Sequence, residues 1–334
     1  MCRCTVKNCM WLVVLLAVVQ LFAGQAFAGQ KWKLGHVCVP DPENSYHATA
    51  LKFKELLAKN TDVDLTIFPQ RQLGDDREML EGIQNGLLEV TAATLGPISA
   101  FQPQVGLLEL PFLYRNPEHL DAVLDGPIGR KLLDGLEKSG FKGLGFFDDG
   151  INNITNSKHP IHSAEDFAGL QMRTIEAPVR IAVMKSLGAN PVPVAYSELY
   201  TALQSGVVDG QSNPNWVITA RSLWEVQKYV SVTQHIWGGA ALVMDLNLFN
   251  ALSPEEQKAV LAAGQEACRY GRKTGRGAEA KHLQKAIDHG MIVDKNPDLD
   301  SMRKATASVY DGVYEEHPGW KPVIEEIKEL GKSY

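Results

Sequence analysis

The segment covering residues 170–214 constrains the fold most strongly, because strand, helix and turn signals alternate along it. Apolar and polar residues alternate around Arg173, which predicts a strand. Apolar residues at helical spacing cover residues 178–187 and 196–205, and a glycine follows each. Residues 207–214 begin with two valines, predicted to be buried, and end in turn residues. We therefore predict strand, helix, short strand, helix and strand, with the carboxyl ends of parallel strands facing a ligand site.

Two polar residues of this segment are candidates for binding a carboxylate. Arg173 lies on a strand edge, and its planar guanidinium matches both oxygens of a carboxylate. The alternative is an ion pair with Glu176 or another acid. Asn213 is followed by Pro214, which favours an extended backbone and a fixed amide. The alternative for Asn213 is a local Asx turn.

Residues 1–28 have the pattern of a secretory signal peptide. Arg3 and Lys7 precede an apolar run over residues 10–22, and the small residues before Gly29 predict cleavage after Ala28. An uncleaved anchor is less compatible with the pattern, because a spanning helix needs about 20 apolar residues. We expect an exported protein of the periplasm.

Of the five cysteines, only Cys38 and Cys268 remain after this cleavage. They could pair in an oxidising compartment or stay as two buried thiols. The sequence has no CxxC motif after residue 28 and therefore gives no support for a metal or redox cofactor.

Composition limits the class of protein. The chain has 334 residues, of which 45% are hydrophobic and 22% charged, which suits a globular protein of two lobes. The net charge of −6 argues against a nucleic-acid partner. The motifs GxSxG, GxxxxGK[ST] and HExxH are absent, which favours a binding protein over an enzyme.

The first part of the chain predicts a β-α-β unit. Strands are expected over residues 31–39 and 63–68, with a helix over 46–60 that Asn44 or Ser45 would cap. A helix N-terminus that faces a cleft suits an anion, so Tyr46 and His47 are candidates for the site. The alternative for His47 is a solvated surface histidine.

Further strands and helices follow the same signals. The apolar strand over residues 141–147 ends in Asp148, Asp149 and Gly150, where we predict the first crossing between lobes. The two acids could receive an ammonium group or lie in solvent. Helices are predicted over residues 77–85, 117–136, 216–226, 254–289, 298–314 and 320–330, and strands over 90–94, 229–241 and 242–244.

Several motifs resemble one known family, the periplasmic solute-binding proteins of tripartite ATP-independent periplasmic (TRAP) transporters, called DctP-like. The resemblance covers essentially the whole mature chain. The motifs are GLQMR at 169–173, LGANPVP at 187–193, SELYTALQ at 197–204, VDGQSNP at 208–214, FP at 68–69, QLG at 72–74 and LPFL at 110–113.

The resemblance implies an α/β fold of the two-lobed periplasmic binding protein type, each lobe a mostly parallel sheet flanked by helices. A long helix spans both lobes. The first lobe would comprise residues 29–150 and about 240–278, and the second 151–239 and about 279–334. The expected partners are a small carboxylate ligand and the small and large integral membrane subunits of the transporter. We expect a monomer.

The resemblance also suggests site residues. Thr94 and Asp76 can face the ligand in this family, although Asp76 also suits a helix cap. Many members have an arginine where this chain has Asn152, many have Glu where it has Ser212, and Tyr196 replaces a frequent Phe.

These departures predict a ligand with a single carboxylate. Without a second guanidinium at Asn152, a second buried anion would be costly. Tyr196 and Trp216 would make the pocket more apolar, unless Trp216 belongs to the core. Aromatic, branched, hydroxy, keto or amino acids should then bind better than succinate-like diacids. The other function class is an exported α/β hydrolase or lyase in which Arg173 anchors a carboxylate and an acid or histidine is the base.

Overall fold

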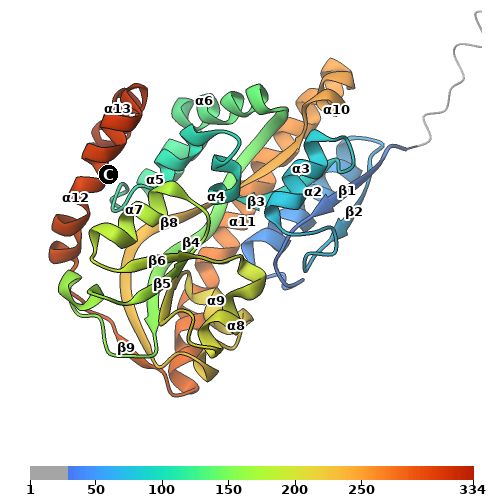
Figure 1. Ribbon diagram of the computed structural model, residues 1–334. Helices are drawn as coiled ribbons and strands as arrows, with labels where there is room; N and C mark the ends of the chain where they lie inside the picture. Colours follow the sequence, from blue (N-terminus) through green and yellow to red (C-terminus); the bar gives the residue numbers. More distant parts are fainter. Residues whose placement is uncertain (1–28) are drawn as a thin grey trace, which may run out of the picture.

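The computed structural model describes residues 29–334, so the predicted signal peptide lies outside the described residues. Within this range no helix is both long and apolar enough to cross a bilayer. The predicted α/β class is confirmed, because a mixed sheet is covered by helices on both faces (Figure 1).

The sheet has nine strands in the order β2-β1-β3-β8-β4-β7-β5-β6, and β9 pairs with β8. The strands are β1 (Lys31–Gly35), β2 (Asp64–Phe68), β3 (Val90–Thr94), β4 (Phe141–Asn156), β5 (Gln171–Thr174), β6 (Asn190–Pro193), β7 (Gly210–Asn213), β8 (Tyr229–Asp245) and β9 (Ile292–Asp294).

The pairing divides the sheet into two lobes that share two long strands. In the first lobe, β1 is parallel to β2 and β3. In the second lobe, β5 is parallel to β6 and β7. The antiparallel pair β4 and β8 runs through both lobes, with bulges between them. The expected two-lobed arrangement therefore results from two parallel units joined by one antiparallel ribbon.

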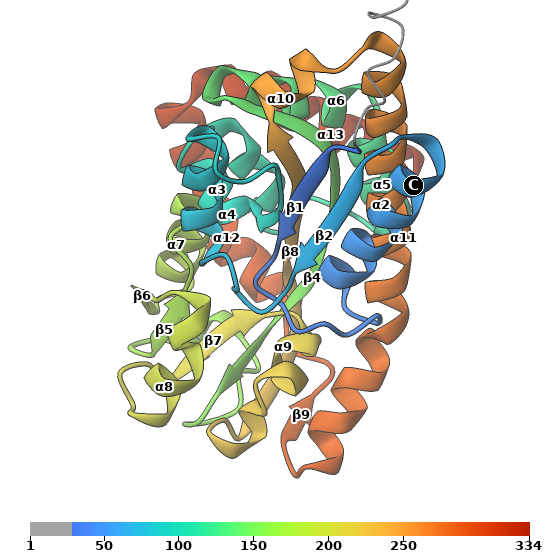
Figure 2. The same ribbon diagram turned by 90° about the vertical axis from the view of Figure 1, so that its right-hand side faces the viewer.

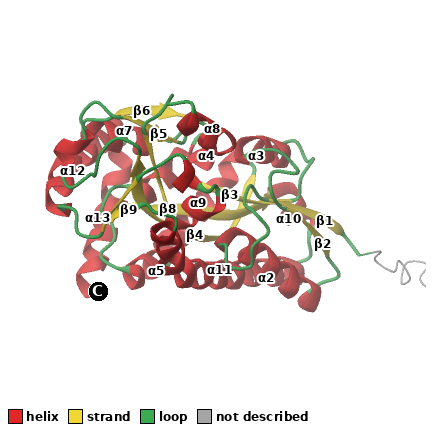
Figure 3. Ribbon diagram, turned by 90° about the horizontal axis from the view of Figure 1, so that it is seen from below, coloured by secondary structure: helices red, strands yellow, loops and turns green. Residues whose placement is uncertain are grey.

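The helices cover both faces of this sheet. Figure 3 shows α2, α5 and α11 along one side, with α3, α4, α7 and α8 on the other. The helices are α2 (Ser45–Asn60), α3 (Asp76–Gln84), α4 (Leu95–Ser99), α5 (Pro117–Asp125), α6 (Pro127–Gly135), α7 (Pro178–Ser186), α8 (Leu199–Gln204), α9 (Asn215–Ala220), α10 (Leu246–Ala251), α11 (Pro254–Asp288), α12 (Leu299–Glu316) and α13 (Lys321–Leu330). The 3-10 turns are η1 (Pro103–Glu109), η2 (Leu136–Ser139), η3 (Ala164–Phe167), η4 (Tyr196–Glu198), η5 (Leu223–Glu225), η6 (Pro318–Trp320) and η7 (Gly331–Ser333).

The predicted long helix is confirmed as α11, which packs against α2 and β4 in the first lobe and against α9 (Figure 2). Ser253 caps it in a capping box. Its glycines allow close packing. A Cβ at Gly264 would lie 2.6 Å from Leu144 Cβ, and one at Gly275 would lie 3.0 Å from Ser45 Cβ. Glycine therefore lets this helix approach its neighbours.

Several local predictions differ from the structure. The strand predicted over 31–39 ends at Gly35, and the helix predicted over 216–226 ends at Ala220, before the turn η5. The strand predicted to end at residue 147 continues through Asp148, Asp149 and Gly150 as β4, because β8 pairs with it across the crossing. The two strands predicted over 229–244 are one strand, β8. The helix predicted over 117–136 is broken at Gly126, before a proline. Val207 is exposed rather than buried, because β7 begins only at Gly210.

Candidate ligand-binding site

A cavity of about 30 Å³ lies where the two lobes meet. Elements of both lobes contribute to its wall, from the loop after β1 to α9. The lining residues are Val37, Cys38, Tyr46, Thr94, Asp149, Arg173, Ile175, Arg180, Tyr196, Asn213, Trp216 and Val217. Six of the nine predicted site residues are in this set, and Asn152, Asp76 and His47 are not.

Arg173 is held in this wall as a buried cation. It is 1% exposed, and its Nε donates to the Val194 carbonyl at 2.9 Å. Its Nη2 is buried and has no hydrogen-bond partner among the described residues. Burial, followed by the nearby Arg180, lowers the pKa of Arg173 to about 10, so the guanidinium remains charged at neutral pH.

The alternative of an ion pair between Arg173 and Glu176 is wrong. Glu176 is largely exposed and lies 3.7 Å from Arg77 instead. Removing a guanidinium from water costs free energy unless an anion pairs with it. Among residues 29–334, Arg173 is therefore a buried cation without a counter-ion.

Asn213 ends β7 beside this guanidinium and is buried. Its side-chain amide lies 2.5 Å from Gln211 Oε1. With its oxygen turned towards Arg173, the amide accepts a hydrogen bond from Nη1 at 3.2 Å. The side chains of two parallel strands, β5 and β7, thus meet at their carboxyl ends, as the sequence predicts.

Aromatic rings form another wall. The ring of Trp216 lies 6.1 Å from that of Tyr196 and 6.4 Å from that of Tyr46, between centroids. Trp216 Nε1 donates to the Asp149 carbonyl at 2.6 Å. Both interpretations of Trp216 therefore hold, because it is 8% exposed and belongs to the core while one side faces the cavity.

Thr94 lines the cavity, and Asp76 fixes its position through hydrogen bonds. Asp76 accepts hydrogen bonds from Thr94 Oγ1 at 2.5 Å and from Thr94 N at 3.2 Å. Burial raises the pKa of Asp76 to about 6. The interpretation of Asp76 as the helix cap is wrong, because Asp75 caps α3 together with Glu78. Asp76 instead lies behind Thr94 and orients it.

Asn152 and His47 lie outside the cavity wall. Asn152 is fully buried, and its Nδ2 donates to Ser212 Oγ at 3.1 Å. His47 Nδ1 lies 3.1 Å from His36 Nε2, and burial lowers the pKa of His47. His47 is therefore not a fully solvated histidine.

Two charged residues of the wall were not predicted as site residues. Arg180 on α7 is buried and pairs with Glu109 of η1 through two hydrogen bonds. The expectation of a cavity without a second guanidinium is therefore wrong, although this one is already paired. The only sequence signal was an arginine among apolar residues of a helix.

Asp149 is the second such residue. It is 6% exposed, so the expectation that it lies in solvent is wrong, and Asp148 is buried as well. Burial raises the pKa of Asp149 to about 7, although Arg180 opposes the shift. Cys38 and Cys268, the two cysteines that remain after the predicted cleavage, are buried free thiols, and Cys38 lines the cavity.

The two lobes touch each other around the cavity. The Arg180–Glu109 pair joins α7 to η1, and Ser197 Oγ donates to Asp75 Oδ2 at 3.2 Å. A Cβ at Gly96 would lie 3.2 Å from Ala177 Cβ. These contacts hold the two lobes together over the cavity.

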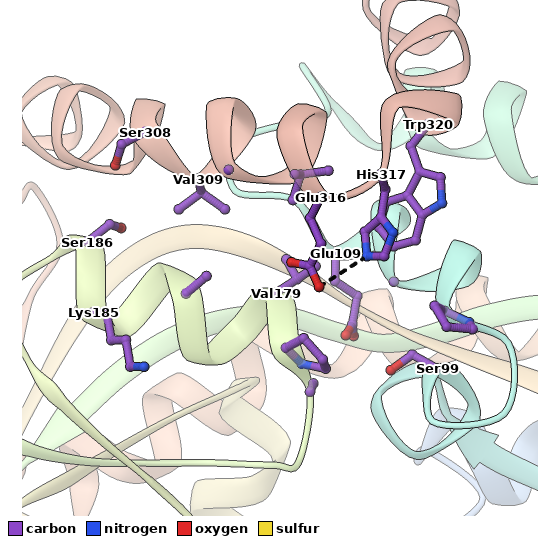
Figure 4. A pocket seen from close by; sticks show the side chains of 17 residues that line it. Ser99, Glu109, Val179, Lys185, Ser186, Ser308, Val309, Glu316, His317 and Trp320 are labelled. Atoms are coloured by element: carbon purple, nitrogen blue, oxygen red, sulfur yellow. Dashed lines mark ion pairs between the residues drawn. The ribbon is translucent and has the colours of Figure 1, made fainter.

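A larger outer cavity is lined by residues of α4, η1, α7 and α12 (Figure 4). Glu109 lines it, whereas Arg180 lines the ligand cavity. His317 and Trp320 stack at 4.0 Å between ring centroids. None of the predicted site residues lies there.

The fold and the cavity define a two-lobed solute-binding protein that holds an anion between its lobes. The chain belongs to the DctP family, described as bacterial extracellular solute-binding protein, family 7, whose model matches residues 34–317. It is 33% identical over 277 residues to the 2,3-diketo-L-gulonate-binding periplasmic protein YiaO of Escherichia coli K12, which covers 82% of this chain and 83% of the relative.

Solved structures agree. A TRAP periplasmic solute-binding protein from Polaromonas sp. JS666, bound to D-erythronate, superposes with a TM-score of 0.85 at 36% identity and covers 90% of this chain and 98% of its own. One from Roseobacter denitrificans, with bound β-D-glucuronate, has a TM-score of 0.85 at 30% identity and covers 90% and 99%. The predicted family is therefore confirmed.

This protein is a TRAP-type solute-binding protein that captures a carboxylate for transport. The family consists of solute-binding proteins rather than enzymes. Its relatives are periplasmic, which supports the same compartment for this chain.

Proposed function

We propose that the ligand is a small monocarboxylate with hydroxyl groups, held between the lobes by Arg173 and Asn213. The observation that carries this proposal is the buried Nη2 of Arg173, which has no partner among the described residues and lines the cavity. A ligand carboxylate can accept two hydrogen bonds from the guanidinium. Asn213 supplies a further contact beside it.

The charges of the wall support one anion rather than two. Arg180 is neutralised by Glu109, so Arg173 is the guanidinium left for a ligand. A second carboxylate in this small cavity would have no free cation, and Asp149 would repel it when ionised. A succinate-like diacid would therefore lose binding energy through desolvation.

The other lining residues suit the rest of such a ligand. Thr94 and Tyr46 offer hydroxyl groups, and Tyr196 and Trp216 offer apolar faces to its carbon chain. In this proposal Asp76 positions Thr94 and Asn152 positions Ser212 behind the wall. His47 has no ligand contact. D-erythronate and β-D-glucuronate, bound by the two neighbours, are hydroxy monocarboxylates.

The wider assignments are proposed with it. The lobes would comprise residues 29–150 with about 240–278, and 151–239 with about 279–334. Cleavage after Ala28 would release a periplasmic monomer. The closed, loaded form would then deliver the acid to the small and large membrane subunits of a TRAP transporter.

A calorimetric panel on the mature protein tests the ligand class. D-erythronate and D-glucuronate should bind with dissociation constants on the order of micromolar or tighter, which corresponds to about 8 kcal/mol. Succinate should bind at least about tenfold more weakly, because its second carboxylate lacks a cation. Stronger binding of C4 dicarboxylates than of any hydroxy monocarboxylate would refute the proposal. Recovery of a chemically altered ligand would instead indicate an enzyme.

A further inference from the structure

Asp149 occupies an unusual position in the fold. It is the extra residue of a β-bulge, because Asp148 pairs with Gly239 and Gly150 with Gly238 while Asp149 has no partner in β8. Bulges redirect side chains and are frequent beside functional sites. Its Oδ2 lies 3.2 Å from the point where a Cβ of Gly238 would stand, so glycine leaves room for the carboxyl.

Among residues 29–334, Asp149 is the only acidic residue that lines the ligand cavity. It is buried, and the structure shows no ion pair to it among residues 29–334, whereas the neighbouring Asp148 is paired with Arg276. The backbone carbonyl of Asp149 accepts from Trp216, so the residue is fixed in place. A fixed polar side chain in a ligand cavity is a natural contact for the ligand.

The groups around Asp149 come from every element that packs near it. The cations are Arg173 of β5 and Arg180 of α7, the second of which is paired with Glu109 of η1. The remaining titratable neighbours are Tyr46 of α2, Asp76 of α3, Cys38 of the loop after β1, Tyr196 of η4, Asp148 of β4, and Glu279 and Arg276 of α11.

Charge balance then depends on the proton of Asp149. In the empty cavity, Arg173 contributes one positive charge and an ionised Asp149 would cancel it. When a ligand carboxylate binds Arg173, an ionised Asp149 leaves one uncompensated negative charge in a buried site. A protonated Asp149 leaves the site neutral, and buried anions that approach one another raise each other's pKa.

We propose that Asp149 is a ligand-binding residue that contacts a hydroxyl group of the bound acid as a neutral carboxyl, so that binding takes up a proton. The neutral carboxyl can both donate to and accept from an alcohol. The inference rests on the proposed function, because it needs a hydroxy monocarboxylate at Arg173. It adds a selection for ligands that carry a hydroxyl on the side facing Asp149.

The direction of the pH dependence follows. Burial raises the pKa of Asp149 to about 7, so the carboxyl titrates within the range in which the protein can be studied. Binding raises this pKa further, so affinity is greatest at low pH and falls as the pH rises through the pKa of the empty protein. Above that pKa, the apparent dissociation constant should increase about tenfold per pH unit until the pKa of the bound form is reached.

Calorimetric titration with D-erythronate in buffers of different ionisation enthalpy measures the protons directly. Wild type should take up a fraction of a proton per ligand near neutral pH, and this fraction should rise towards one as the pH increases. Asp149→Asn keeps the shape and hydrogen-bonding capacity but does not titrate. It should bind with no proton uptake and with a flat pH profile.

Glu279 provides the matched control. Burial raises its pKa to about 7 as well, but it accepts from the Asn215 backbone at 3.4 Å and does not line the ligand cavity. Glu279→Gln should therefore keep proton uptake on binding, with its pH midpoint shifted to lower pH because a charged neighbour of Asp149 is lost. Loss of uptake in Glu279→Gln, with uptake retained in Asp149→Asn, would overturn the inference.

The proposed preference for ligands that carry a hydroxyl group can be tested separately. Asp149→Ala should weaken D-erythronate about tenfold or more and leave butyrate unchanged, because only the former loses a hydrogen bond. Wild-type binding of D-erythronate without proton uptake overturns the inference and leaves the proposed function intact. Stronger binding of serine, without proton uptake, would mean that an ionised Asp149 holds an ammonium group and would also overturn it. If no hydroxy monocarboxylate binds wild type, both fail together.

Discussion

The ligand cavity is lined by Arg180 and the outer cavity by its partner Glu109. The two cavities differ in whether the other charged side chains on their walls have a counter-ion or water to interact with. The outer cavity has a volume of about 560 Å³ against about 30 Å³ for the ligand cavity, but Lys185 and Glu316 on its wall can be solvated. The ligand cavity is small, yet it holds Arg173, a buried cation with an unpartnered nitrogen. A buried cation without a counter-ion among residues 29–334 is therefore a better indication of an anion site than volume is.

Four experiments test this comparison, beginning with the Arg180–Glu109 pair. Glu109→Gln should lower the free energy of unfolding by about 3–5 kcal/mol, because it leaves Arg180 buried without a counter-ion. Chemical denaturation measures this change. The double variant Glu109→Leu with Arg180→Met should recover most of the loss, since apolar residues of similar volume replace both charges. Equal stability of single and double variants would contradict the account.

Arg173→Lys should weaken binding of a hydroxy monocarboxylate by about 10- to 100-fold, because an ammonium cannot form the bidentate contact. The melting temperature of the empty protein should change little, since Arg173 forms no ion pair to lose. Calorimetry and a thermal melt check the two parts. Unchanged affinity would show that the unpartnered guanidinium is not the anchor.

Asn213→Ala removes the amide beside that guanidinium and should cost about tenfold in affinity, in keeping with one hydrogen bond to a charged group. The loss should appear for every carboxylate in the panel, because the contact is to the carboxylate itself. A loss restricted to hydroxylated ligands would instead place Asn213 at another part of the ligand.

Lys185→Ala changes the outer cavity alone and should have the smallest effect. Lys185 lines that cavity and not the ligand cavity, so ligand affinity should remain within about twofold. Stability should change by less than about 0.5 kcal/mol, as at other surface positions. A marked loss of carboxylate binding in this variant would show that the two cavities are not independent.

Much of the architecture could be predicted from local patterns. The unit from β5 to β7, the capping of α11 by Ser253 and the length of that helix all follow from periodicity and end signals over a few residues. Predictions failed where the extent of a strand depends on the strand that pairs with it. β4 continues through Asp148–Gly150 because β8 lies beside it, although the local residues favour a turn.

The same distinction between local sequence and tertiary structure applies to the site residues. The residue types and their place after parallel strands were enough to select Arg173 and Asn213, and the family motifs selected Thr94 and Tyr196. Only the tertiary structure decided the partners of the charges. Arg180 looked like an ordinary helix residue, and Asp149 looked solvent-exposed beside a glycine. Burial and the cost of an unpaired charge depend on elements far apart in the chain, and no short segment of sequence contains them.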